Sequence, residues 1–144
     1  MRSIQAVLVL MSGLTAGCST TANLYPVQGP LASQIPLPVI VATANGITGG
    51  TGSIALRMPD GEECAGKWSS VAPTMAGTGT LFTQYGSMIG FTYSGIQPGV
   101  NKGQAFMTCS HGTTLEAEFF TGSGTANGYG IARDSNKNVY KMLF

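Results

Sequence analysis

The chain has 144 residues, which is enough for one domain with a modest core and too few for two. Only 9 % of the residues are charged and the formal net charge is +1. These values exclude both the clustered basic face of a nucleic-acid-binding protein and a disordered chain kept solvated by charge. No apolar run reaches the roughly 20 residues that a membrane-spanning helix needs. Glycine is frequent, with 21 residues, which favours tight turns and bent strands.

Residues 1–17 have the organisation of a secretory signal peptide. Met1 and Arg2 make a short positive start, and residues 4–14 form an apolar segment. This segment is too short to be a stable membrane span. We therefore expect residues 1–17 to be removed and to take no part in the fold.

The apolar segment ends in the sequence LTAGC at residues 14–18, which resembles the lipobox of bacterial lipoproteins. The resemblance implies cleavage before Cys18, a diacylglycerol on the Cys18 thiol and a third acyl chain on the new amino group. Two or three acyl chains anchor a protein stably, whereas one chain binds a membrane only marginally. Because the next residue is Ser19 and not aspartate, the resemblance also implies sorting to the outer membrane. The alternative is an ordinary secreted protein in which Cys18 follows the apolar segment by chance.

Two cysteines remain when Cys18 carries lipid, and they can pair in only one way. Cys64 and Cys109 form an even pair in an oxidising compartment, so we expect a disulfide between them. Free thiols are one alternative. A metal site or a nucleophilic thiol is another, since Cys109 and His111 are two residues apart and would share one face of a strand. A zinc site takes three or four ligands, and the chain has no second histidine. The disulfide is therefore the favoured interpretation, and no metal site is predicted.

Residues 18–37 are predicted to be the lipidated cysteine and a proline-containing tether. Residues 19–37 carry no charge and include prolines, which favour extended or edge conformations. Residues 19–23 are expected to be flexible. Residues 24–31 are less polar, so an ordered, extended course along the folded body is the alternative for them.

From residue 38 onward the pattern is typical of β structure. Turn signals such as Asn45-Gly46 and Asp60-Gly61 separate segments in which apolar residues alternate with polar ones. The pattern predicts an all-β domain over residues 38–144, a small antiparallel meander closed or half-closed into a barrel or sandwich of about eight strands. The predicted strands are residues 38–43, 50–58, 62–69, 79–85, 87–94, 103–109, 113–121, and 127–133 paired with 138–144.

Candidate catalytic residues are few, and each of them fits a structural role. His111 is the only histidine and is predicted to lie in a turn, since the sequence lacks the serine elbow that could join it in a triad. Glu116 and Glu118 could act as paired carboxylates, but in an alternating strand they belong to the solvent face. Asp60 and Asp134 fit turns. No catalytic residue is therefore predicted.

The glycine-rich segment 122–130 is the favoured interaction loop, because loops on a rigid β scaffold commonly carry recognition. Residues 106–115 are similar to the opening strand of membrane-bound lysozyme inhibitors, which are small disulfide-bonded β-barrels on lipid anchors. Members of that family insert a loop serine and a lysine into the acidic cleft of the enzyme. The resemblance therefore implies interaction residues, which are Ser123, Gly124, Tyr129 and Lys141.

Residues 24–31, 61–68 and 128–134 resemble small lipoproteins of Gram-negative bacteria, a resemblance that implies no particular activity. The sequence thus predicts a non-enzymatic lipoprotein of the outer membrane, whose small periplasmic β domain binds a partner or is a structural component of the envelope. The expected partners are the membrane, reached through the lipid on Cys18, and an envelope protein. Neither nucleic acid, nor a cofactor, nor a small-molecule substrate is predicted. A lysozyme inhibitor is the alternative function.

Overall fold

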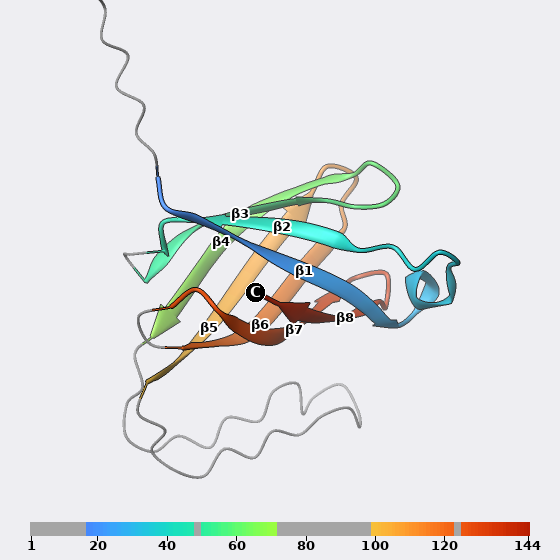
Figure 1. Cartoon of the computed structure of the whole chain (residues 1–144). Coiled ribbons are helices and arrows are strands. Elements are labelled where there is room, and N and C mark those ends of the chain that lie inside the picture. The colour runs from blue at the N-terminus through green and yellow to red at the C-terminus, as the bar shows by residue number, and fades with distance from the viewer. Residues whose placement is uncertain (1–16, 48–49, 72–98, 123–124) are drawn as a thin grey trace, which may run out of the picture.

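The structure, a computed structural model, describes residues 17–47, 50–71, 99–122 and 125–144. Antiparallel strands follow one another around a closed barrel, in which β8 pairs back onto β1 (Figure 1). A short 3-10 helix, η1 (Pro30–Ser33), connects β1 to β2. The strands are β1 (Ser19–Gln28), β2 (Ile40–Asn45), β3 (Thr51–Arg57), β4 (Glu63–Val71), β5 (Val100–Cys109), β6 (Thr114–Gly122), β7 (Gly128–Asp134) and β8 (Val139–Leu143). The predicted all-β class is confirmed, and the barrel is closed.

The first strand corrects the predicted organisation of the chain. The flexible tether expected over residues 19–23 is wrong, whereas the ordered, extended course considered for residues 24–31 is confirmed for residues 24–28. Both stretches belong to β1, which pairs with β2 along one edge and with β8 along the other. Ala22 and Leu24 alternate with more exposed residues and point into the barrel. The register shifts between Pro26 and Gln28, so the strand accommodates its proline at an irregularity. Of the other predicted strands, 79–85 and 87–94 lie outside the described residues, and the rest match β2 to β8.

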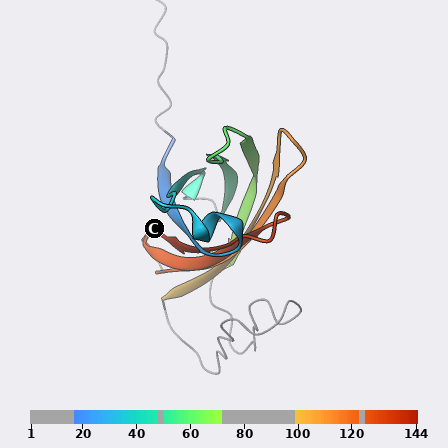
Figure 2. The same cartoon turned by 90° about the vertical axis from the view of Figure 1, so that its right-hand side faces the viewer.

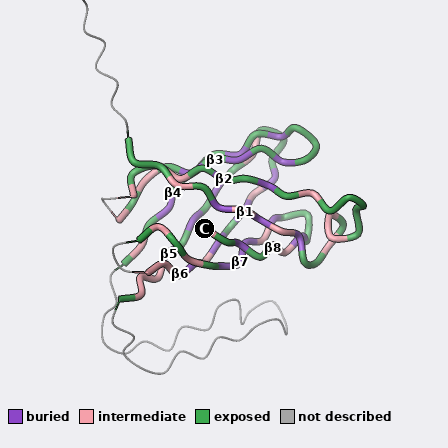
Figure 3. The backbone as a smooth tube through the Cα atoms, viewed as in Figure 1, coloured by how far each residue is buried: buried purple, intermediate pink, exposed green. Residues whose placement is uncertain are grey.

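The core lies inside the barrel, because alternate residues of each strand face inward (Figure 3). The predicted alternation of apolar and polar residues is confirmed in β3, β6 and β8, since their apolar residues on the inward face are buried. Large side chains fill the half of the interior near the disulfide. These are Leu24, Leu56, Met58, Met107, Leu115 and Tyr140.

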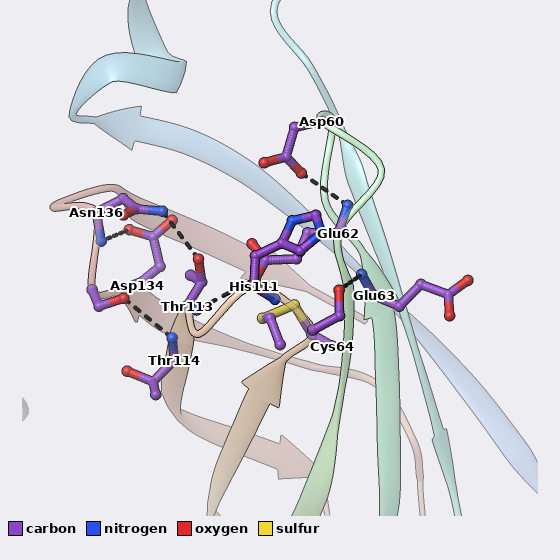
Figure 4. The surroundings of a disulfide bond; sticks show 12 residues. Asp60, Glu62, Glu63, Cys64, His111, Thr113, Thr114, Asp134 and Asn136 are labelled. Atoms are coloured by element: carbon purple, nitrogen blue, oxygen red, sulfur yellow. Dashed lines mark hydrogen bonds between the residues drawn. A yellow bond between two sulfur atoms is a disulfide. The ribbon is translucent and has the colours of Figure 1, made fainter.

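The disulfide ties β4 to β5 at one end of the barrel. Cys64 and Cys109 are direct partners in the ladder, with their Cα atoms 3.9 Å apart. The predicted pairing is confirmed, so neither sulfur is a free thiol. Beside it, the Glu62 side chain of the β3–β4 turn accepts hydrogen bonds from the amides of His111 and Thr113, at 2.7 and 3.3 Å (Figure 4). The disulfide thus links β4 to β5, and the hydrogen bonds of Glu62 link the two turns that adjoin these strands.

A second polar network closes the same end at the β7–β8 turn. The Asp134 carboxylate accepts hydrogen bonds from the amides of Asn136 and Asn138, both at 2.9 Å, and from the Tyr140 hydroxyl at 2.6 Å. Burial, together with the hydrogen bond to Asp134, raises the pKa of the Tyr140 hydroxyl well above its usual range. The Leu31 amide of η1 donates to the Asn138 side chain at 2.9 Å. This bond holds η1 across the barrel end, as the view along the barrel shows (Figure 2).

Stability should depend on Glu62 in acid. Burial opposes ionisation of this carboxyl, but hydrogen bonds from the Thr113 side chain and from the amides of His111 and Thr113 prevail and lower its pKa below the ordinary 4.5. The stabilisation from the lowered pKa is present above pH 4.5 and is lost as the pH falls through the folded-state value. Urea unfolding of the parent chain at a series of pH values should therefore give a free energy of unfolding that declines below this point. In Glu62→Gln the decline should be shallower, and an identical pH profile would contradict the assignment.

Candidate functional site

The two ends of the barrel differ, and the end opposite the disulfide contains a cavity of about 640 Å³. This volume lies within the range of about 300–1,000 Å³ that is usual for ligand sites. Strands β1 to β6 and β8 all contribute to its wall, mostly with the residues at their ends far from the disulfide. We call this cavity the mouth cavity. The described residues that line it are Cys18, Thr20, Ala44, Ile47, Gly50, Ile54, Trp68, Ser70, Asn101, Phe119, Thr121, Thr125, Ala126, Met142 and Phe144.

Aromatic side chains form the apolar part of the wall. The Trp68 and Phe119 rings meet edge to face with centroids 6.5 Å apart, and Phe119 lies 5.5 Å from Phe144. The Trp68 ring is fixed by its Nε1–H, which donates to the Asn45 carbonyl oxygen at 2.9 Å. Gly103 leaves the room that Phe119 occupies, since a Cβ at residue 103 would run into that ring. One hydrogen bond and ring packing thus hold the Trp68 and Phe119 side chains in place, which favours binding because little order has to be imposed on them.

Small residues in part of the wall help to keep the cavity open. Ala44 and Gly50 line it with almost no side chain, whereas large residues fill the interior near the disulfide. The rim carries hydroxyl groups of Thr20, Ser70 and Thr121. No acidic or basic side chain is among the described residues of the wall. A cavity of this composition suits an uncharged, mainly apolar ligand.

Cys18 lies at the rim of this cavity. Its carbonyl oxygen accepts a hydrogen bond from the Gly46 amide at 3.3 Å, and the next residue, Ser19, begins β1. The residue is exposed and its thiol is free. The predicted lipid-attachment residue is thus joined to the barrel without an intervening tether, a feature that the sequence analysis did not predict.

Of the predicted interaction residues, Tyr129 and Lys141 lie away from the cavity wall. Tyr129 on β7 is half-exposed, and its ring lies 6.0 Å from that of Phe120. Lys141 on β8 is exposed and stands opposite Ile131, two residues along from Tyr129. Tyr129 and Lys141 are therefore near neighbours on the outer surface of the barrel. Their proposed companions in the loop, Ser123 and Gly124, lie outside the described residues.

The residues considered for acid–base chemistry are dispersed. His111 is exposed in the β5–β6 turn, where it was predicted, and its backbone amide donates a hydrogen bond to the Glu62 side chain. Glu116 is exposed on β6, whereas Glu118 is half-buried and accepts a hydrogen bond from Gln104 at 3.2 Å. Asp60 and Asp134 accept backbone amide hydrogen bonds in turns, as predicted. Within the described ranges, no cluster of three or more metal-ligating side chains is found.

The fold and the site together define a closed, eight-stranded antiparallel barrel with an apolar cavity at one mouth. No protein-family model matches the chain, and neither the curated proteins nor the solved structures contain a match. Among the residues that the structure describes, no helix is long and apolar enough to cross a membrane.

Proposed function

We propose that the protein is a lipoprotein of the outer membrane, anchored through Cys18, whose periplasmic barrel binds an apolar ligand in the mouth cavity without catalysing a reaction. The observation that carries this proposal is the apolar cavity of about 640 Å³ with Cys18 on its rim. The LTAGC sequence at residues 14–18 supports the anchor. Anchoring confines the barrel to a thin layer at the membrane and raises its effective concentration toward partners fixed in the envelope.

Binding can be measured with the fluorescence of Trp68, which is the only tryptophan and lines the cavity. The probe is hexadecanol that carries a nitroxide quencher, titrated into the Cys18→Ser variant so that no lipid or thiol is present at the rim. The proposal expects saturable quenching of Trp68. Quenching that only rises in proportion to probe concentration would contradict a binding site.

Ala44→Phe should weaken this binding by about tenfold or more, equivalent to about 1.4 kcal/mol. The new ring would occupy the cavity, because Ala44 lines it between its ladder partners Thr20 and Ile54, which also line it. The matched control is Thr43→Phe, which adds the same ring on the exposed face of the same strand. Equal affinities of the two variants for the nitroxide probe, with both folded by circular dichroism, would place the ligand elsewhere.

A further inference from the structure

We propose that, when the protein is away from a membrane, the mouth cavity is occupied by one of the acyl chains attached to its own Cys18. This inference rests on the lipidation and the apolar site proposed above. It adds the identity of an occupant and a condition under which that occupant leaves.

The position of Cys18 is the first argument. Cys18 and Thr20 both line the cavity, and the hydrogen bond from the Gly46 amide to the Cys18 carbonyl holds the backbone at the rim. Because Ser19 already belongs to β1, no linker separates the lipid from the barrel. A chain attached to the Cys18 sulfur therefore starts at the opening. Its effective concentration there would be on the order of millimolar, as for two sites joined by a short linker.

The chemistry of the wall is the second argument. The interior part of the wall includes Ile54, Phe119 and Met142, and the described lining has no charged side chain. Neither a hydrocarbon chain nor another apolar ligand makes hydrogen bonds. The two therefore have the same effect on the hydrogen bonding of the polar groups in this wall. Transfer of the acyl chain out of water is favourable, and its attachment point, Cys18, itself lines the mouth cavity.

The same argument predicts release at a membrane. The bilayer also removes the chain from water, and it does so without ordering the chain inside a fixed wall. The chain should therefore leave the cavity when the anchor inserts. The cavity would then be free for its ligand only on an anchored protein, so that ligand binding in transit would be suppressed.

The test attaches a single chain at a known atom. Cys18 has the only free thiol among the described residues, since Cys64 and Cys109 form the disulfide. A thiol-reactive hexadecyl reagent that carries a nitroxide is coupled to purified protein whose first residue is Cys18. Residues 1–17 are left out of this protein because every described strand begins at Ser19 or later. The fluorescence of Trp68, which lies in the cavity wall, is quenched when the nitroxide is inside the cavity.

In buffer we expect Trp68 emission to be at least fivefold lower than in protein coupled to a hexadecyl chain without the nitroxide. The extent of quenching should be the same at every protein dilution. Phosphatidylcholine vesicles should restore the emission. Ala44→Phe should abolish the quenching in buffer, whereas Thr43→Phe should retain it, because only the first ring fills the cavity.

Three results would overturn the inference. They are unquenched emission in buffer, quenching that disappears on dilution as in a micelle, and quenching that persists after the chain has inserted in vesicles. If the Cys18→Ser barrel still binds free nitroxide hexadecanol in that case, the proposed function stands and only the own-chain inference is lost. If the free probe does not bind either, both proposals fail.

Discussion

Removal of the disulfide is expected to lower the free energy of unfolding by about 2–4 kcal/mol, the stabilisation that is usual when a bridge closes a loop of this length. The bridge joins residues that are 45 apart in sequence, and the connection between them includes all of the chain between β4 and β5. In the double variant Cys64→Ala/Cys109→Ala, the denatured chain regains the freedom that the bridge removes. Urea unfolding should show an earlier midpoint.

The matched control is Arg57→Ala, which removes an ion pair to Glu63 at the same end of the barrel. Both of these side chains are 69 % exposed, so the loss should not exceed about 1 kcal/mol. The loss of the bridge should therefore clearly exceed the loss of the ion pair. Equal midpoints for the double variant and the parent chain would contradict a stabilising role of the disulfide.

Cys18→Ser is expected to move the protein from the membrane fraction into the soluble periplasmic fraction. Among the residues that the structure describes, no helix is long and apolar enough to cross a membrane, and the net charge of the whole chain is only +1. A nearly neutral protein has little electrostatic attraction to a lipid surface, so in the proposed lipoprotein the acyl chains supply the attachment. Cell fractionation followed by immunoblotting would measure the redistribution.

Ser19→Asp provides the matched control for this experiment, since it changes the neighbouring residue and leaves the lipid-attachment thiol in place. It should remain in the membrane fraction but shift from the outer to the inner membrane, as the lipobox resemblance implies. A Cys18→Ser protein that still sediments with outer membranes would refute the anchor.

Much of the barrel was predictable because its strands obey a simple alternation. In β3, Ile54 and Leu56 point inward while Arg57 is exposed, and the sequence shows this period of two directly. The disulfide was predictable as well, since only Cys64 and Cys109 were left to pair. The strands follow from a local pattern of residues, and the disulfide follows from the number of cysteines. The pattern and the number can both be read from the sequence without knowing how the strands are arranged.

The start of β1 and the mouth cavity were not predicted, for different reasons. The inward face of β1 has only Ala22 and Leu24 between polar residues and a proline, so its alternation is weak until β2 and β8 bury it. The cavity has no local signal at all. It exists because the barrel closes and brings small residues such as Ala44 and Gly50 together with Trp68 from another strand. Tertiary closure, and not propensity, decides both features.

The membrane anchor and the own-chain inference both depend on lipid at Cys18, so the intact mass of the protein extracted from outer membranes is the most direct test. The account predicts a chain that begins at Cys18 and carries the added mass of a diacylglyceryl group and an amide-linked acyl chain. Fragmentation should place the added mass on Cys18, with Cys64 and Cys109 still bridged. A chain that begins at another residue, or one with an unmodified Cys18 thiol, would contradict the account.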